Sequence, residues 1–291
     1  MAADAGAPVW FEHDGLRFHA RDSGPPGAPA VLLLHGFPGG TETWERTGLA
    51  LRRSGGTELR TIALRQRGYG PEARPSGVRS YRLRMLTDDA LALADHLGLE
   101  RFHVVGHDWG GMVGWSLAAT RPARVASLTV LSTPHPRAFA SALARSAQAV
   151  RSLYAAAFQL PLIPEAALTA GGGRPLRAAL VRSGLDEEMA DRYVARIGTA
   201  DAMGAALNWY RAVARRPSDA WTVGPIDVPT TYAWSTDDPA ISRRAAELTA
   251  RHVVGPYRFH VLDGVSHWIP ETAPAETAAL VREAVDRGDA R

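Results

Sequence analysis

Short apolar runs alternate with longer amphipathic stretches along most of this 291-residue chain, and this alternation restricts its fold more than any other feature. Residues 30–34 are apolar at every position, as in a strand that is covered on both faces of a sheet. Residues 81–97 place their leucines and alanines on one helical stripe, and Gly98 follows as a suitable helix-ending glycine. A strand followed by a helix, repeated in this order, predicts an α/β fold with a doubly wound, mostly parallel sheet.

The pattern changes between Pro134 and Pro225, where the sequence predicts helices and no strand. We therefore divide the chain into a core of residues 1–134 and 226–291 and a helical lid of residues 135–225. Open α/β sheets bind ligands at the carboxyl ends of their strands, and the lid directly follows an expected strand at 125–131. Lid helices are expected at 138–150, 175–183, 186–197 and 200–215, with a flexible turn at 171–173. The other expected elements are a hairpin (9–11 and 16–19), strands at 59–64, 102–105, 230–234 and 257–262, and helices at 242–251 and 273–286.

Composition removes several other classes of protein. The chain has no cysteine, which excludes a disulfide framework, a thiolate metal site and a cysteine nucleophile. Its 33 basic residues, all arginine, only slightly outnumber its 30 acidic residues, and adjacent arginines occur as isolated pairs. We therefore expect no nucleic-acid partner. No apolar run approaches the roughly 20 residues of a spanning helix, and residues 1–10 show no signal peptide. We therefore expect a cytoplasmic protein without a membrane span.

The segment GHDWGG at 106–111 predicts a strand, a tight turn and the start of a helix. Gly106 and Gly110 frame Asp108 in the pattern of a nucleophile elbow, where small residues are needed because the turn is strained. A carboxylate at this position is nucleophilic at neutral pH without a base, and its attack on carbon gives an ester. The alternative is that Asp108 only caps the following helix.

Three other segments bear on this choice. The segment HGFPGG at 35–40 follows an expected strand, so its backbone N–H groups could hold an oxyanion, although it could also be an ordinary turn. His267 follows the strand at 257–262, where a lone histidine is often structural. Asp237 and Asp238 follow the strand at 230–234. The order of nucleophile, acid and histidine is the one that α/β-hydrolases use.

With these motifs, the chain resembles α/β-hydrolases of the epoxide hydrolase type over nearly its whole length. HGFP at 35–38 resembles the oxyanion loop of that family, and GHDWGG and the segment 264–271 resemble its elbow and its histidine segment. Spacing from Trp234 matches the family's acid to Asp238, although the adjacent Asp237 could exchange roles with it. RGYG at 67–70 resembles a family loop that we interpret as structural.

The expected lid carries the most discriminating part of the resemblance. NWYR at 208–211 resembles the family's motif around one active-site tyrosine, Tyr210, and the segment from Tyr154 to Gln159 resembles the motif around the other. A phenol suits the reaction because its O–H stabilises the alkoxide that forms as an epoxide C–O bond breaks. Packing is the alternative role for each aromatic ring.

The resemblance implies a cofactor-free and metal-free reaction of a small hydrophobic epoxide with water to give a vicinal diol. Asp108 attacks the ring while the tyrosines hold its oxygen, and His267, oriented by Asp238, activates the water that hydrolyses the ester. The backbone N–H groups of Phe37 and Trp109 would hold the oxyanion. Further substrate contacts are expected from His35, Pro38, Trp109, Phe158 and Trp268.

Two alternative functions and one structural question stay open. A haloalkane dehalogenase could use the Trp109 indole for the departing halide, but Phe37 offers no second polar donor from its side chain. A non-catalytic ligand-binding homologue is also open because fold does not imply function. A serine esterase is excluded because position 108 has no hydroxyl. Whether two copies form a homodimer is not predicted.

Overall fold

The computed structural model describes residues 6–146 and 148–290, and an eight-stranded sheet lies at its centre. The strand order is β1-β2-β4-β3-β5-β6-β7-β8; β2 runs antiparallel to β1 and β4, and the remaining neighbours are parallel. This confirms the mostly parallel sheet. The strands are β1 (Ala7–His13), β2 (Leu16–Ser23), β3 (Ala30–Leu34), β4 (Arg60–Arg65), β5 (Phe102–His107), β6 (Val125–Leu131), β7 (Thr230–Asp237) and β8 (Tyr257–Ser266).

The expected hairpin is confirmed at the start of the described chain. Asp14 and Gly15 join β1 to β2 with φ of 53° and 69°, both in the left-handed region. A two-residue turn of this kind matches the twist of the strands that it connects, and the Asp-Gly pair tolerates it.

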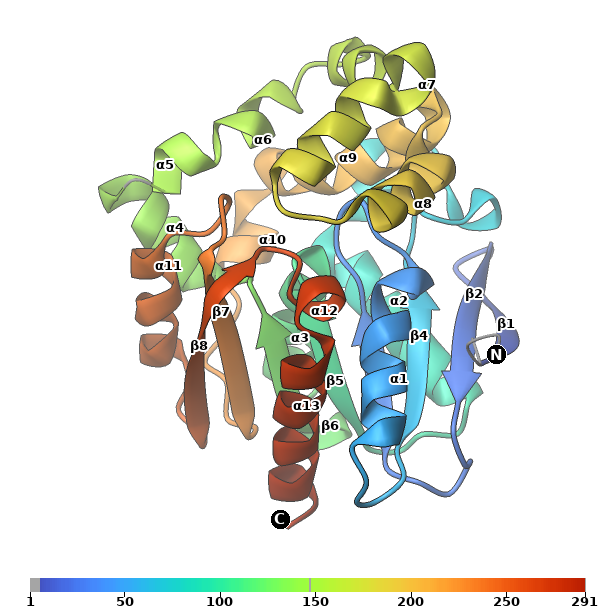
Figure 1. Cartoon of the computed structure of the whole chain (residues 1–291), viewed down its shortest axis with the longest axis vertical. Helices are drawn as coiled ribbons and strands as arrows, with labels where there is room; N and C mark the ends of the chain where they lie inside the picture. The colour runs from blue at the N-terminus through green and yellow to red at the C-terminus, as the bar shows by residue number, and fades with distance from the viewer. Residues whose placement is uncertain (1–5, 147, 291) are drawn as a thin grey trace.

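Helices cover both faces of the sheet (Figure 1). The alternating side chains of β3 show the division: Leu32 and Leu34 belong to the larger buried cluster, while Val31 and Leu33 belong to the smaller one. A strand buried on both sides must be apolar throughout, which explains its continuous run. The larger cluster includes side chains of α2 (Leu83–His96), α3 (Trp109–Thr120) and α11 (Arg243–Leu248), and the smaller includes those of α1 (Glu45–Arg53), α12 (Ile269–Thr272) and α13 (Pro274–Asp289).

Between β6 and β7, the described residues form helices and no strand, as the sequence predicts. They are α4 (Pro136–Arg145), α5 (Gln148–Arg151), α6 (Leu153–Ala157), α7 (Ile163–Arg182), α8 (Glu187–Ile197), α9 (Ala200–Arg215) and α10 (Pro217–Trp221). We call this segment the helical insertion. Figure 1 shows α5 to α9 above one end of the sheet.

The single helix expected at 138–150 is wrong. The first helix ends at Arg145, because Ser146 is extended with φ of −151° and ψ of 179°, and the short helices α5 and α6 follow. The turn at 171–173 lies within α7, where three glycines with positive φ interrupt the helical backbone. Among the described residues, no helix combines the length and apolar character needed to cross a membrane.

Candidate active site

Asp108 stands on a strained turn between β5 and α3. Its φ of 50° and ψ of −121° are unusual for a residue with a side chain, and such strain marks functional sites. The turn requires glycine at two nearby positions. A Cβ at Gly106 would lie 2.3 Å from the Gly110 oxygen, and one at Gly110 would lie 1.9 Å from the Leu34 oxygen. The side chain of Asp108 makes no capping hydrogen bond to α3, which argues against the helix-cap interpretation.

The carboxylate of Asp108 faces His267, which in turn contacts Asp238. His267 Nε2 lies 3.7 Å from Asp108 Oδ2, and His267 Nδ1 lies 2.8 Å from Asp238 Oδ2. Asp238 is buried and its Oδ1 accepts the N–H groups of Ala240 and Ile241 at 2.7 and 2.9 Å. The neighbouring Asp237 is exposed. The structure thus brings together Asp108, His267 and Asp238, and it places Asp238 rather than Asp237 against the imidazole.

Burial and charge act in opposite directions on this group of three. Burial by itself lowers the pKa of His267, but the charge of Asp238, its hydrogen bond to the imidazole and the nearby Asp108 carboxylate raise that pKa well above its usual value. Burial by itself raises the pKa of Asp108, but the neighbouring His267 and the hydrogen bond from Phe37 N–H hold it below the usual value. The imidazole and the two carboxylates therefore favour one another's charged forms.

The loop after β3 supplies a backbone donor to Asp108. Phe37 N–H donates to Asp108 Oδ1 at 2.9 Å. The loop comes this close because position 36 is glycine: a Cβ there would lie 2.3 Å from the Asp108 Cβ. Trp109, the other expected backbone donor, is the first residue of α3 and lines the cavity beside Asp108.

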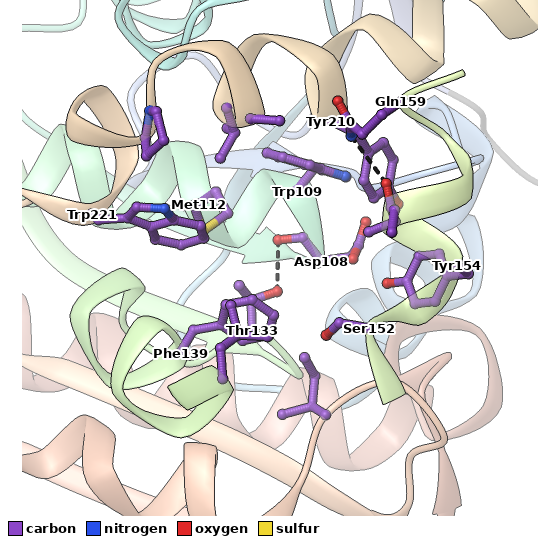
Figure 2. Close-up of a pocket in the computed structure, with 17 residues that line it drawn as sticks. Asp108, Trp109, Met112, Thr133, Phe139, Ser152, Tyr154, Gln159, Tyr210 and Trp221 are labelled. Carbon is purple, nitrogen blue, oxygen red and sulfur yellow. Dashed lines mark hydrogen bonds between the residues drawn. The ribbon is translucent and has the colours of Figure 1, made fainter. Parts of the chain in front are cut away.

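Asp108 opens into a cavity of about 340 Å³ under the helical insertion (Figure 2). Figure 2 shows Tyr154, Tyr210 and Gln159 on one side of Asp108, with Met112, Phe139 and Trp221 on the other. We call the second group, together with Leu143, Val213 and Ile241, the apolar arm. Of the described residues that line the cavity, Asp108 alone carries a charge.

Both expected tyrosines line this cavity. Tyr154 lies on α6 and Tyr210 on α9, and their ring centroids are 6.2 Å apart. The Tyr154 hydroxyl points toward Asp108 in Figure 2, although the residue is 43% exposed. Burial, with the charge of Asp108 as a further cause, raises the pKa of each phenol above its usual value. The hydroxyls are therefore protonated donors at neutral pH.

Two expected substrate contacts are corrected by the structure. His35 is fully buried, and its ring nitrogens hydrogen-bond to the backbone: Nδ1 lies 2.9 Å from the Gly36 oxygen and Nε2 accepts Gln66 N–H at 3.2 Å. Trp268 packs against His267 and donates its indole N–H to Ser183 Oγ at 3.0 Å. Neither side chain lines the cavity.

The other two expected contacts lie beside the cavity wall. Phe158 packs on Tyr154, Tyr210 and Phe37, with ring centroids 5.5, 5.1 and 5.9 Å away. Pro38 is buried in the loop after β3. Neither lines the cavity, and Phe158 packs against both tyrosines that do.

Sequence reasoning missed several residues that the fold brings to the site. The Thr133 hydroxyl donates a hydrogen bond to the Asp108 carbonyl oxygen at 2.7 Å. Trp221 lies in the apolar arm and stacks on Phe139, with ring centroids 5.8 Å apart. His107 hydrogen-bonds to the His267 carbonyl oxygen at 2.9 Å. Within the described part of the chain, no three acidic or histidine side chains are grouped to hold a metal ion.

Comparison with known proteins identifies one family model and several relatives that align with most of the chain. Residues 29–274 match the family model for the alpha/beta hydrolase fold. The chain is 36% identical to AB hydrolase superfamily protein YfhM from Bacillus subtilis (strain 168), covering 93% of this chain and 94% of that protein. It is 31% identical to Epoxide hydrolase A from Mycobacterium tuberculosis (strain ATCC 25618 / H37Rv), covering 96% and 97%. The crystal structure of Epoxide Hydrolase A from Mycobacterium thermoresistibile is similar with a TM-score of 0.79 and 29% identity, covering 95% and 97%. The chain belongs to the alpha/beta hydrolase fold family.

Proposed function

We propose that this protein is an epoxide hydrolase, which converts an epoxide and water to a vicinal diol through a covalent ester on Asp108. One observation carries the proposal: a strained carboxylate faces a buried His–Asp pair while two protonated phenols lie across the same cavity. The relatives named epoxide hydrolase, which align over most of this chain, support the same reaction. We further propose that residues 135–225 act as the lid of this site.

In the first step, Asp108 Oδ2 attacks a ring carbon. The new C–O bond forms as the ring C–O bond breaks, and the leaving oxygen takes a proton from a tyrosine hydroxyl. Esterification removes one of the two negative charges that raise the pKa of His267, so His267 can give its proton to the tyrosinate and restore the tyrosine. His267 is then neutral and can act as a base.

In the second step, His267 Nε2 takes a proton from water and the resulting hydroxide adds to the ester carbon. The oxyanion develops on Oδ1, which already accepts the Phe37 N–H, with Trp109 N–H as the second proposed donor. The ester C–O bond breaks, and the departing alkoxide takes the proton of the new carboxylic acid. The diol leaves, and Asp108 and His267 are charged again.

The cavity favours a neutral substrate with an apolar substituent. An anionic substrate would meet the charge of Asp108, whereas the apolar arm offers Met112, Phe139 and Trp221 to a hydrocarbon or aryl group. With the substituent in this arm, the epoxide oxygen would face Tyr154 and Tyr210 on the other side of Asp108. Styrene oxide is a suitable first substrate.

The test is a single turnover of styrene oxide in ¹⁸O-labelled water. We expect the label in the peptide that contains Asp108, because water attacks the carboxyl carbon. Asp108→Ala should abolish diol formation and His267→Gln should accumulate the ester, while the exposed neighbour variant Asp237→Ala keeps wild-type activity. An active Asp108→Ala protein, or a diol whose oxygen comes directly from water in the first turnover, would refute the proposal.

A further inference from the structure

Gln148, on the short helix α5, is a buried amide with three polar partners beyond its own backbone. It is fully buried, its Oε1 accepts the Ser242 N–H at 2.8 Å, and its Nε2 donates to the Ala240 oxygen at 2.7 Å and to Ser152 Oγ at 3.0 Å. A buried amide gains stability only when such partners are present, so this side chain is fixed in place.

The turn that Gln148 holds is the one that holds Asp238. The Asp238 carboxylate accepts the N–H groups of Ala240 and Ile241, and Gln148 grips the same turn at Ala240 and Ser242. Arg151, one helical turn further along α5, donates to the Asp238 backbone oxygen at 2.5 Å. Helix α5 of the helical insertion therefore holds the core turn that positions Asp238.

The third partner of Gln148 leads to the other side of the site. Ser152 lines the cavity and lies at the start of α6, which carries Tyr154. The amide thus joins the Asp238 turn to the tyrosine helix, two parts that lie far apart in the sequence.

We infer that Gln148 is a positioning residue for the hydrolytic step, which sets the contact of Asp238 with His267. This inference rests on the proposed function. Without the amide, the Ala240 oxygen and the Ser242 N–H lose their partner and the turn relaxes. The 2.8 Å contact between Asp238 and His267 then lengthens, and His267 becomes a weaker base in the ester intermediate.

The experiment compares Gln148→Met, which keeps the length of the side chain but removes its polar atoms, with wild type under pre-steady-state and steady-state conditions. We expect kcat to fall about tenfold because ester hydrolysis slows, while kcat/KM, which reports ester formation, stays within about threefold of wild type. The titratable groups around His267 are Asp108, Asp238, His107 and Glu271. Since Asp238 raises the pKa of His267, the ascending limb of kcat should move to lower pH.

Two further variants separate positioning from general loss of stability. Arg151→Gln changes an exposed side chain and should lower kcat in the same way but less, because it removes only the contact with the Asp238 backbone. Thr87→Val removes a buried hydrogen bond to Ser116 in the C-terminal half of α3, which does not line the cavity, so it should lower stability but leave kcat and the ascending limb of its pH profile unchanged.

The outcomes also separate this inference from the proposed function. If wild type forms no ester on Asp108, the proposed function fails. Suppose instead that wild type forms and hydrolyses the ester, and that Gln148→Met has the same kcat and the same ascending limb in the pH profile of kcat. Only the role of Gln148 then fails. A parallel fall of kcat and kcat/KM, with the limb unshifted, would also overturn that role.

Discussion

The two tyrosines of the cavity stand on parts of the helical insertion that are held in different ways. Tyr210 belongs to the part formed by α8 and α9, which is joined to the core by ion pairs: Glu42 with Arg196, Glu45 with Arg192, and Arg46 with Asp186. Tyr193 of α8 adds hydrogen bonds to Thr43 and Glu271, and Trp209 of α9 donates to the Arg67 oxygen.

Tyr154 belongs to the part formed by α5, α6 and the segment that continues to Leu162, which exposes apolar side chains instead. Val150, Leu153 and Leu162 are 69%, 64% and 77% exposed. This part reaches the rest of the molecule through the polar contacts of Gln148 and Arg151, and through Arg211 of α9, which donates to the Phe158 and Leu160 oxygens. Tyr210 is therefore held by a part of the insertion that ion pairs join to the core, whereas Tyr154 is held by a part with a few hydrogen bonds. We call the ion pairs and hydrogen bonds that join α8 and α9 to the core the clamp.

The largest expected effect tests whether both parts serve one reaction. Replacing Tyr154 and Tyr210 together by Phe should remove epoxide opening, a loss of about 10³-fold or more, since each lost donor to a developing oxyanion costs about 10²–10³. Each single variant should retain measurable turnover through the remaining phenol. The check is the rate of ester formation in a single turnover. Normal opening by the double variant would rule out the tyrosines as the donors.

The clamp itself is tested by Arg196→Ala. Glu42 is 2% exposed, so losing Arg196 leaves a buried carboxylate without its cation, and we expect about 3–5 kcal/mol lower free energy of unfolding. Arg177→Ala is the matched control, because that arginine pairs with Asp191 and Glu187 at the surface, where solvent screens the pair, so its loss should cost far less. Urea unfolding measures both. Equal losses in the two variants would mean that the clamp is no stronger than a surface pair.

The clamp should also depend on pH through Glu271. Burial raises the pKa of this carboxyl to about 7, so its contribution to stability is complete below its usual pKa of 4.5 and is lost as the pH rises through 7. Glu271→Gln should therefore be more stable than wild type at pH 8, by about 3 kcal/mol at most, and not at pH 4. Urea unfolding at the two pH values measures this. The exposed Glu276→Gln is the control, and identical pH profiles of Glu271→Gln and wild type would contradict the prediction.

The smallest effect is expected in the exposed part. Leu153→Ser and Leu162→Ser should each change the free energy of unfolding by less than about 0.5 kcal/mol, since both side chains lie largely in solvent. Thermal unfolding of each single variant checks this. A loss above about 1 kcal/mol would show that another surface covers this face in solution, and the contrast between the two parts would then be smaller than the structure indicates.

Local patterns predicted most of the sheet and the positions of the chief polar groups. The apolar run of β3, the Asp14-Gly15 turn and the glycines around Asp108 each act over a few residues, so the sequence shows them directly. The resemblance placed Tyr154 and Tyr210 correctly in the cavity because their motifs lie on the helices that line it.

What escaped prediction depends on contacts between distant segments. His35 and Trp268 lie within the expected motifs, but hydrogen bonds to Gln66 and Ser183 turn them away from the cavity. Gln148 could not be found from sequence, since its partners at Ala240 and Ser242 are mostly backbone atoms more than 90 positions away. A hydrogen bond to a backbone atom does not require a particular residue type at the partner position, so the sequence contains no pattern that indicates it.

Gly36 limits how a protein of this kind can change over evolutionary time. Any larger residue there would collide with the side chain of Asp108, because its Cβ would lie 2.3 Å from the Asp108 Cβ. Mutations that retune the choice of substrate must therefore accumulate elsewhere, in the apolar arm or the helices above it, while this position stays without a side chain for as long as the reaction is kept.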